Sequence, residues 1–567
     1  MRDPKSLRSH SWFQGKEYYN FGRRAWLRSE GFGHNIFEDK PIIGICNSWS
    51  ELNNCNVHLR QLAEAVKRGV WAAGGVPLEF PTMSLGEMFM KPTTMLFRNL
   101  MAMDVEESIT ANPIDSVVLL AGCDKTTPAQ LMGAASADVP AIMVTGGPML
   151  AGRWRKQTLG SGTDGRRLFD DYRTGRIGDE QLAEIEGCLS RSHGHCTVMG
   201  TASTMASLAE AMGMMLPGGA AIPAVDARRA ALAEESGRRA VELAWEGLKP
   251  SDIMTPDAIE NAVRVDMAIG GSTNAVPHLL AIAGRLGVDL TLADFDRISR
   301  ETPFITNVKP SGEHVMEDFF YAGGLPTVMK ELLPLLHGDA LTINGKTLAE
   351  NLANAPDPDR EMVRPLDDPI HKEGGSAILY GNLCPDGAVF KQTAASRHLW
   401  KHRGKAVVFE THREMLDRID DPDLEVDKDS VMVMKSGGPL GGPGFPEWGH
   451  IPIPTKLLKA GVKDMLRISD ARMSGTSFGA NVLHVSPESE AGGPLVAVQT
   501  GDEIELDVEA RTLTLLVDAD EIEKRLAAWK PRAPHYKRGY GKLFLDTVTQ
   551  AHEGCDFRFL HKEQEED

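Results

Sequence analysis

Three of the seven cysteines lie in settings typical of metal-binding thiolates. They are Cys55 within Asn-Asn-Cys-Asn, Cys123 within Gly-Cys-Asp-Lys, and Cys196 within His-Gly-His-Cys-Thr. Three thiolates suit an iron–sulfur cluster, and a cluster with only three protein ligands leaves one position open for chemistry on iron. Asp124 and Lys125 follow the second cysteine directly, so hard, charged groups lie beside the soft thiolate. The sequence therefore places soft and hard metal chemistry at one loop.

Simpler roles are expected for the other histidines, cysteines, methionines and polar residues that could belong to a site. His193 and His195 flank Cys196, and we expect them to orient a neighbouring group rather than to ligate metal directly. The other four cysteines, at positions 46, 188, 384 and 555, lack such motifs and are expected to be ordinary thiols. Methionines at 199, 205, 212, 214 and 215 indicate core packing. Ser272, Thr273 and Asn274 either line a pocket or cap a helix.

Composition limits the class of protein. The chain has 567 residues, 42% of them hydrophobic and 25% charged, which is the balance of a globular protein of two to four domains. A formal charge of -18 argues against nucleic-acid and anionic-membrane partners, which require a basic face. The first ten residues lack the apolar core of a signal peptide, and no apolar stretch approaches the ~20 residues of a membrane span. We therefore expect a cytoplasmic protein.

Short apolar runs alternate with helical patterns through the first two thirds of the chain. Residues 41–46 and 116–121 are typical of strands, and residues 57–73 of a helix that ends at Gly74-Gly75. This rhythm predicts an α/β domain with a parallel sheet. Cys123 would then lie where a strand ends and a helix begins, which is the usual ligand edge of such a sheet.

Each of the three cysteines is expected to precede a helix. Thr127 is the expected N-cap after Cys123, with Pro128 at the first helical position and Gln130 completing a capping box. Cys55 precedes the helix near residue 57, and Cys196 precedes a helical stretch at 201–215. Because the field at a helix N-terminus stabilises negative charge, we expect all three sites to favour thiolate.

The pattern changes after a Pro- and Asp-rich segment at 354–375, which reads as a linker. Short β-type runs follow at 377–380, 405–409, 430–434, 465–468, 495–498, 503–508 and 512–516. They predict a β-barrel-like domain with flanking helices, so we expect an N-terminal domain at 1–370 and a C-terminal domain at 371–567. The end looks helical from about residue 521 and then becomes a polar tail. Gly-rich loops at 436–447 and 470–479 allow backbone to approach a ligand closely.

Six ordered motifs give the chain a specific resemblance over nearly its whole length. They are Asn-Cys-Asn at 54–56, Gly-Cys-Asp-Lys-Thr-Thr-Pro at 122–128, Thr-Ala-Ser-Thr-Met-Ala at 201–206, Gly-Gly-Ser-Thr-Asn-Ala at 270–275, Gly-Gly-Pro-Gly-Phe-Pro-Glu at 441–447 and Asp-Ala-Arg-Met-Ser-Gly-Thr at 470–476. The chain resembles the dihydroxyacid and sugar-acid dehydratases, a family often named together with 6-phosphogluconate dehydratase. The resemblance implies a hydro-lyase that removes water from a 2,3-dihydroxy acid and gives a 2-keto acid through an enol.

The resemblance also implies the cofactors. Cys55, Cys123 and Cys196 would ligate a [2Fe-2S] cluster, with [4Fe-4S] as the alternative. Glu87, Asp124, Glu447 and Lys125 would hold Mg²⁺, and Lys125 can serve as a ligand only when carbamylated. These groups would stabilise the enediolate-like charge and ease the departure of the C3 hydroxyl.

Two assignments of catalytic residues rest on the resemblance alone. Ser474 would act as an alkoxide base on the C2 proton, and Thr476 would hydrogen-bond substrate or steady the loop. Without the resemblance, the residues favour a surface pair of Lys125 with Asp124, and Ser474 as a turn residue.

The resemblance also leads to expectations about the branch of the family and about the oligomeric state. The motifs around Ser474 and residues 86–92 look like the sugar-acid branch, which implies an aldonate such as L-arabinonate, D-xylonate or D-gluconate as the small-molecule substrate. One alternative is the dihydroxy-acid dehydratase of branched-chain amino-acid biosynthesis, and another is a cluster-containing sensor or binding protein. The resemblance further implies a homodimer or homotetramer, with the active site between the two domains.

Overall fold

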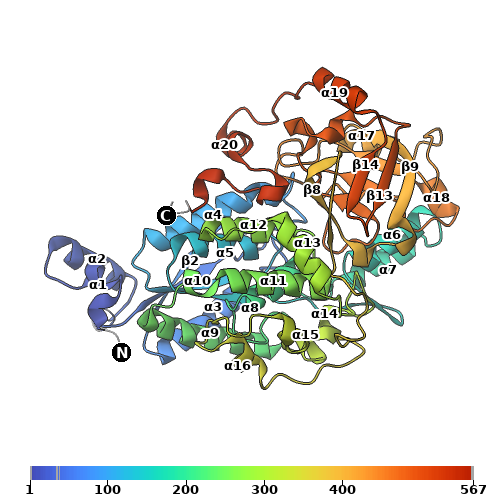
Figure 1. Ribbon diagram of the computed structural model, residues 1–567. Coiled ribbons are helices and arrows are strands. Elements are labelled where there is room, and N and C mark those ends of the chain that lie inside the picture. The colour runs from blue at the N-terminus through green and yellow to red at the C-terminus, as the bar shows by residue number, and fades with distance from the viewer. Residues whose placement is uncertain (1–2, 34–35, 37–38, 563–567) are drawn as a thin grey trace.

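The computed structural model describes residues 3–33, 36 and 39–562. The polar tail expected at the C-terminus falls largely on residues 563–567, outside the described residues. Figure 1 shows a helix-rich body that contains β2 in its left half, a barrel at the upper right, and a short helical arm at the N-terminus. Within the described residues, no helix is long and apolar enough to cross a membrane.

The first part of the chain alternates strands and helices. Its strands are β1 (Ile42–Asn47), β2 (Val76–Pro81), β3 (Ser116–Ala121), β4 (Ala141–Thr145), β5 (Gly152–Trp154) and β6 (Gln157–Leu159). Its helices are α1 (His10–Phe13), α2 (Tyr18–Ser29), α3 (Leu59–Ala72), α4 (Met95–Thr110), α5 (Thr126–Ala137), α6 (Thr163–Arg173), α7 (Asp179–Leu189), α8 (Thr201–Ala211), α9 (Ala227–Glu246), α10 (Pro250–Ile253), α11 (Pro256–Ile269), α12 (Ala275–Leu286), α13 (Leu292–Glu301), α14 (Met316–Tyr321), α15 (Gly324–Leu332) and α16 (Leu348–Leu352).

The second part carries the remaining strands and helices. They are β7 (Ala377–Gly381), β8 (Cys384–Phe390), β9 (Lys401–Phe409), α17 (His412–Arg418), β10 (Val431–Met434), α18 (Thr455–Lys459), β11 (Arg467–Ser469), β12 (Asn481–Leu483), β13 (Glu503–Asp507), β14 (Thr512–Leu515), α19 (Ala519–Ala528) and α20 (Gly539–Thr547). No helix or strand lies between α16 and β7 in the described chain, which is where the linker was expected.

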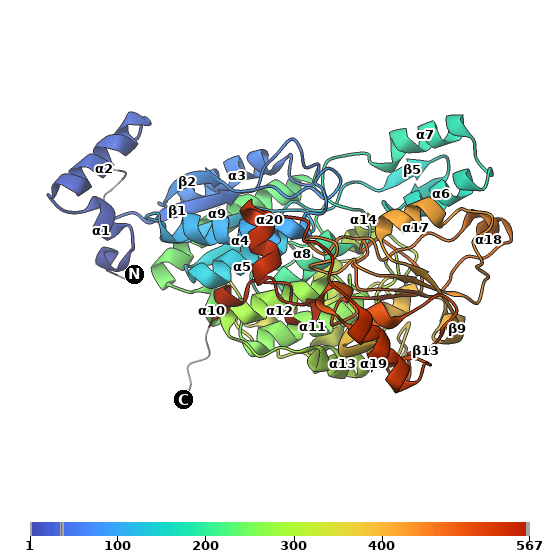
Figure 2. The same cartoon turned by 90° about the horizontal axis from the view of Figure 1, so that it is seen from above.

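A four-stranded parallel sheet in the order β2-β1-β3-β4 organises the first part. Helices α3 and α9 pack on each other and on the sheet, and Figure 2 shows α4 and α5 on its other side. β1 and β3 are buried along their whole length, because helices cover both faces. The parallel α/β prediction is confirmed.

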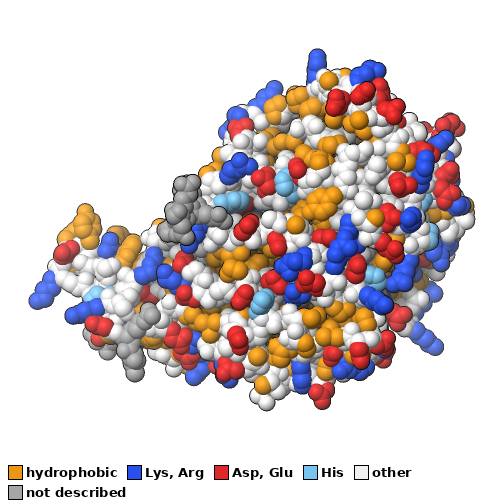
Figure 3. Space-filling view, viewed as in Figure 1, with side chains coloured by type: hydrophobic (Ala, Val, Ile, Leu, Met, Phe, Trp, Pro, Cys, Tyr) orange, Lys and Arg blue, Asp and Glu red, His pale blue; other side chains and the backbone are white. Residues whose placement is uncertain are grey.

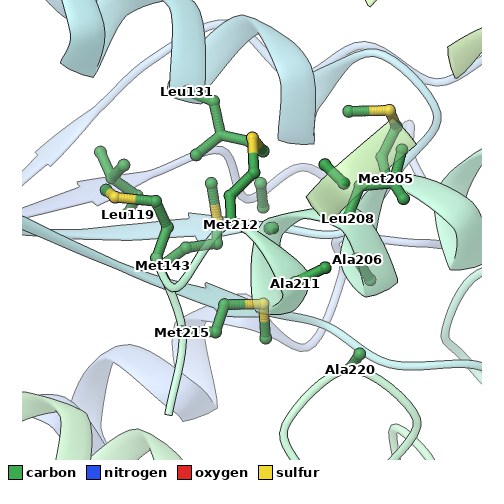
Figure 4. Packing of buried hydrophobic residues seen from close by; sticks show 14 of the residues in the cluster. Leu119, Leu131, Met143, Met205, Ala206, Leu208, Ala211, Met212, Met215 and Ala220 are labelled. Carbon is green, nitrogen blue, oxygen red and sulfur yellow. The ribbon is translucent and has the colours of Figure 1, made fainter. Parts of the chain in front are cut away.

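Methionines fill the space between the sheet and the neighbouring helices. Met143 of β4, Met205 and Met212 at α8, Met215 and Leu119 belong to one hydrophobic cluster, in which Met143 lies beside Leu119 (Figure 4). All five are almost completely buried. The expectation that the methionine run packs in the core is confirmed. Met is unbranched and polarisable, so it fills irregular gaps between helix and sheet.

The second part is built on a closed barrel of strand order β10-β11-β12-β8-β7-β14-β13-β9. Its inside is lined by aliphatic side chains such as Leu379, Val433 and Ile504. The barrel prediction is confirmed, and closure removes every free sheet edge from these strands. After the barrel, the chain returns to the first part, where Tyr540 of α20 donates a 2.7 Å hydrogen bond to the Leu96 carbonyl oxygen.

Several boundaries differ from the sequence predictions. Residues 495–498 were expected to be a strand but belong to a 3-10 helix, Pro494–Ala497, because Pro494 starts a helical turn. β8 and β12 were not predicted, since β8 contains Pro and Gly and β12 is only 3 residues long. The helix expected at 201–215 ends at Ala211, where Met212 caps it.

The capping prediction for α5 is wrong. The helix begins at Thr126, with Lys125 rather than Thr127 in the N-cap position. The Thr126 hydroxyl accepts the Cys123 backbone N–H at 2.9 Å, which tightens the turn by one residue. Gln130 does not complete a capping box, because its amide donates to the Leu120 carbonyl oxygen at 3.0 Å.

The N-terminal arm of α1 and α2 projects from the body in both ribbon views. Tyr18 and Trp26 on α2 are 80% and 77% exposed. Figure 3 shows hydrophobic side chains gathered at the left end, over the arm, while charged side chains of both signs are scattered among other side chains on the rest of that face. The arm is held at its base by Asp115, whose carboxylate accepts the Ser9 hydroxyl at 2.6 Å.

Candidate functional site

The three cysteines come from three loops that each precede a helix. Cys55 lies four residues before α3, Cys123 follows β3 and precedes α5, and Cys196 precedes α8. The loops pack closely, since a Cβ at Gly122 would lie 2.9 Å from the Cys55 carbonyl oxygen. All three are free thiols that line one cleft. The sequence prediction that the three cysteines precede helices is confirmed.

Electrostatic contacts place the three thiols in one cluster. A hydrogen bond with the Cys123 thiol, together with burial, raises the pKa of Cys55 well above its usual value. Burial, with Asp124 nearby, raises the pKa of Cys196 to about 12. The expectation that helix N-termini favour thiolate is therefore wrong for Cys55 and Cys196. Desolvation outweighs the helix field, and a bound cation would be needed to stabilise the thiolates.

Beside the thiols, three carboxylates surround the buried Lys125 ammonium. Lys125 Nζ lies 3.1 Å from Glu87 Oε2, 3.2 Å from Glu447 Oε1 and 3.6 Å from Asp124 Oδ2. The Lys125 side chain is fully buried. The alternative of a surface Lys125–Asp124 pair is thus wrong, because Lys125 is enclosed by carboxylates from both parts of the chain.

The charged groups in this cluster shift one another's pKa values. Burial and Arg472 would lower the pKa of Lys125, but Glu87, Glu447 and Asp124 outweigh them and raise it. Burial would raise the pKa of Glu87, but Lys125 and Arg472 hold it at about 2. Burial, opposed by Lys125, raises the pKa of Asp124 to about 6. A cation in this place is therefore strongly stabilised.

Two further residues complete the carboxylate cluster. Arg472 Nη1 donates to Glu447 at 3.1 Å, and its Nη2 donates to Thr93 Oγ1 at 3.1 Å. Asn274 Nδ2 donates to Glu447 at 3.3 Å and to the Met473 carbonyl oxygen at 3.0 Å. Asn274 was a candidate for lining the pocket, whereas Arg472 was not singled out. The sequence feature that could have identified Arg472 is its position, as a charged residue, inside the motif at 470–476.

Ser474 and Thr476 lie in a turn that faces the same cleft. Their hydroxyl oxygens are 3.0 Å apart, and the Ser477 N–H donates to the Ser474 carbonyl oxygen at 3.0 Å. Gly475 must be glycine, because a Cβ there would lie 2.6 Å from both Ser272 Oγ and the Thr201 backbone nitrogen. The close packing at Gly475 therefore fixes the backbone of this turn, and the turn places Ser474 in the lining of the cleft.

One cleft of about 1820 Å³ joins these groups. Its wall includes Cys55, Cys123, Cys196, Glu87, Asp124, Glu447, Ser474 and Thr476. Lys125 lies just behind this wall, in contact with its three carboxylates. The cleft is lined by residues of both the first part and the barrel part, and its volume is large enough for a small acid.

The neighbouring histidines contact each other and the backbone. The His193 ring stacks on His58 with centroids 4.4 Å apart. His195 Nδ1 lies 3.2 Å from the Cys196 carbonyl oxygen, and its Nε2 is buried with no partner among the residues described. His58 Nε2 lies 2.8 Å from the Gly146 carbonyl oxygen. These rings pack behind the cysteine loops and hold backbone, as expected for His195.

The donor set fits two different ions. Three thiols suit iron and three carboxylates suit magnesium. No group of three or more His, Cys, Asp and Glu residues in the described ranges encloses a metal ion as it stands, and the Lys125 ammonium lies among the carboxylates. Removing that positive charge would turn the same place into an all-oxygen site.

Comparison with known proteins agrees with this arrangement. Residues 40–351 match the N-terminal region of the dihydroxy-acid/6-phosphogluconate dehydratases, and residues 361–555 match the C-terminal region. The chain is 55% identical to an L-arabonate dehydratase of Azospirillum brasilense, covering 98% of this chain and 97% of that protein. It is 50% identical to an L-arabinonate dehydratase of Rhizobium leguminosarum bv. trifolii, covering 98% and 96%.

A third relative acts on a longer acid. The chain is 48% identical to a 6-deoxy-6-sulfo-D-gluconate dehydratase of Pseudomonas putida, again covering 98% of this chain and 96% of that protein. All three relatives are named as dehydratases of sugar acids. The chain thus belongs to the dihydroxy-acid/6-phosphogluconate dehydratase family, within its sugar-acid branch.

Proposed function

We propose that this chain dehydrates an aldonate to the 2-keto-3-deoxy acid, with L-arabinonate as the first candidate and D-xylonate and D-gluconate as the next. The observation that carries the proposal is the single cleft onto which three thiols, three carboxylates and Ser474 open. Similarity to two proteins named for L-arabonate and L-arabinonate supports the choice of substrate.

Two sets of residues would hold the cofactors. Cys55, Cys123 and Cys196 would ligate a [2Fe-2S] cluster, in preference to [4Fe-4S]. Glu87, Asp124, Glu447 and a carbamylated Lys125 would hold Mg²⁺. When bound, these groups supply Lewis acidity to the substrate carboxylate and to the leaving C3 hydroxyl. Carbamylation would give Lys125 an anionic oxygen in place of its ammonium.

Ser474 would take the C2 proton on its Oγ. Thr476 Oγ1 lies 3.0 Å from that oxygen and can donate a hydrogen bond to it, which stabilises the deprotonated form. The electron pair of the C2–H bond forms the C2–C3 double bond as the C3 hydroxyl leaves and is protonated to water. The enol then takes a proton at C3 and becomes the 2-keto acid. Redox change is not required.

Arg472 and Asn274 would position this chemistry. Arg472 holds both Glu447 and Thr93, so it fixes one carboxylate relative to the Glu87 loop. Asn274 links Glu447 to the Met473 carbonyl oxygen, directly before Ser474. The base and the carboxylates are thereby held at a constant separation. We further propose a cytoplasmic homodimer or homotetramer whose partner is a small sugar acid.

A substrate panel tests the proposal. Anaerobically purified protein with Mg²⁺ is assayed for 2-keto-3-deoxy acid release from L-arabinonate, D-xylonate, D-gluconate and 2,3-dihydroxyisovalerate. Faster turnover of an aldonate supports the proposal, whereas preference for 2,3-dihydroxyisovalerate would assign the chain to branched-chain amino-acid synthesis. Chelation of Mg²⁺ should abolish turnover while the visible absorbance of the cluster persists. Absence of turnover on every acid, with the absorbance intact, would favour a sensor or binding protein.

A further inference from the structure

Helix α6 contacts the turn that carries Ser474. Thr163, its first residue, donates a hydrogen bond of 2.6 Å from Oγ1 to the Thr476 carbonyl oxygen. Gly162, directly before the helix, approaches so closely that an added Cβ would lie 2.1 Å from Thr476 Oγ1. Figure 2 shows α6 and α7 beside α17 and α18 of the barrel part. The α6 helix thus forms a wall of the cleft next to the reacting groups.

Arg166 lies one turn into this helix and faces the cleft. Its Nη1 donates to the Ser477 hydroxyl, and the side chain lines the cleft with Cys196 and Glu447. Burial lowers the pKa of Arg166, while the charges of Glu447 and Cys196 oppose that effect. The guanidinium is therefore partly desolvated and lies within the electrostatic reach of both proposed metal sites.

No carboxylate neutralises Arg166 within ion-pair distance among the described residues. Asp170, one turn further along α6, forms its ion pair with Arg173 at 3.0 Å. Arg173 is also held by Asp420 of the barrel part, at 3.1 Å. An arginine has five N–H donors, and the contact to Ser477 uses one of them. The side chain lines the cleft, so a ligand bound there can accept hydrogen bonds from the other donors.

The wall around Arg166 carries apolar side chains next to charged ones such as Asp170 and Arg173, which form ion pairs. Phe169, Ile185, Ile419 and Ile453 line the same cleft. A sugar acid carries hydroxyl groups beyond C3 that need hydrogen-bond partners, whereas a branched 2,3-dihydroxy acid carries only methyl groups there. A cation with free donors on that wall therefore distinguishes the two classes of acid.

We propose that Arg166 is a specificity residue that donates hydrogen bonds to the hydroxyl oxygens beyond C3 of the aldonate. This inference rests on the proposed function. The carboxylate and the C2 and C3 oxygens belong at the floor, where Glu87, Asp124 and the cysteines lie. The rest of the substrate then extends along the wall formed by α6. Ser477 holds the guanidinium in position before substrate binds.

The experiment compares Arg166→Ala, Arg166→Lys and the control Arg153→Gln, an exposed arginine of β5 in the same segment. Steady-state kinetics are measured with L-arabinonate and with 2,3-dihydroxyisovalerate. Arg166→Ala should lower kcat/KM for L-arabinonate roughly 10- to 100-fold, mainly through KM, and change the value for the branched acid less than about 3-fold. Arg166→Lys should retain more activity, and added guanidinium ion should partly restore Arg166→Ala.

A binding measurement separates substrate contact from loss of structure. In the Ser474→Ala background, calorimetric binding of L-arabinonate should weaken when Arg166→Ala is added, with unchanged cluster absorbance. Equal losses on both acids, or no loss, would overturn the assignment of Arg166 while leaving the proposed function intact. A wild-type protein without turnover of any aldonate would overturn both. Loss of activity without guanidinium rescue and with a lowered melting temperature would identify a structural role and also overturn the assignment.

Discussion

Glu447 Oε1 lies 3.2 Å from Lys125 Nζ, although 322 residues separate them in the chain. Lys125 caps α5 beside the parallel sheet, and Glu447 lies in the Gly-rich loop after β10 of the barrel. The Lys125 side chain is fully buried and that of Glu447 is only 15% exposed. The ion pair therefore joins the two parts of the chain, and the carboxylate cluster exists only when both are packed together.

Replacing Glu447 should weaken both the metal site and the fold. In Glu447→Gln prepared without Mg²⁺ and with Lys125 as the ammonium, the buried Lys125 and Arg472 lose a shared negative partner, which should lower the free energy of unfolding by about 3 kcal/mol. The Mg²⁺ concentration for half-maximal activity should rise at least roughly tenfold, because a ligand oxygen loses its charge. Mg²⁺ titrations and calorimetry measure both effects. Glu425→Gln, at an exposed carboxylate of the same part, should change neither value.

Cysteine substitutions separate the cluster ligands from ordinary thiols. Cys123→Ser should lose most of its iron and visible absorbance, since serine replaces a soft ligand by a hard one. Cys188→Ser is the matched control, because the Cys188 thiol only donates to the Ile185 carbonyl oxygen at 3.6 Å within α7. Iron analysis after anaerobic purification gives the readout. Equal iron in the two variants would contradict the ligand assignment.

Ser474→Ala should lower kcat by about 10²- to 10⁴-fold, the range for loss of a general base. Iron content and Mg²⁺ dependence should stay at wild-type values, since no proposed metal ligand changes. Ser190→Ala removes another hydroxyl from the wall of the same cleft and should leave kcat unchanged. A Ser474→Ala variant with nearly full kcat would exclude Ser474 as the base.

The glycine between Ser474 and Thr476 provides a test of geometry. Gly475→Ala forces the turn away from Ser272 Oγ, which an added Cβ would approach to 2.6 Å. A shift of this size should reduce kcat by about 10²-fold. Gly187→Ala, where nothing lies within 4 Å of the added Cβ, should be neutral. The kinetics of both variants are compared at equal iron content, and an unaffected Gly475→Ala enzyme would argue against strict positioning.

A buried carboxyl away from the cysteines should make stability depend on pH. Burial, opposed by Lys391, raises the pKa of Asp266 to about 7. The folded chain then keeps a proton that the unfolded chain loses near pH 4. The free energy of unfolding should fall as pH rises from about 4 to about 7, by roughly 1 kcal/mol per pH unit.

Asp266→Asn should remove that dependence, since the amide imitates the neutral carboxyl. Melting temperatures across pH 4 to 8 give the comparison, with Asp289→Asn, at an exposed aspartate, as the control. A pH profile that is identical in wild type and Asp266→Asn would show that Asp266 is ionised in the folded protein.

Elements that depend on short-range patterns could be predicted from the amino-acid sequence. The strands at 41–46 and 116–121, the helix at 57–73 and the barrel runs follow from local hydrophobic periodicity, so their existence could be predicted. The loops of the three cysteines could be placed for the same reason, because each lies next to a predicted helix. Where local signals conflicted, as in Pro- and Gly-containing β8, prediction failed.

The assembly of the site could not be predicted from the sequence, because it depends on contacts between distant segments. The residues alone favoured a surface pair for Lys125, whereas the packing of sheet against barrel encloses its side chain between Glu87 and Glu447. The contacts of Arg472 and Arg166 depend on the same packing, because their partners Glu447 and Ser477 are distant in the sequence. Desolvation also reversed the local expectation for Cys196, whose thiol pKa rises although a helix follows. Charges and burial act through space between distant segments, so one-dimensional patterns do not record them.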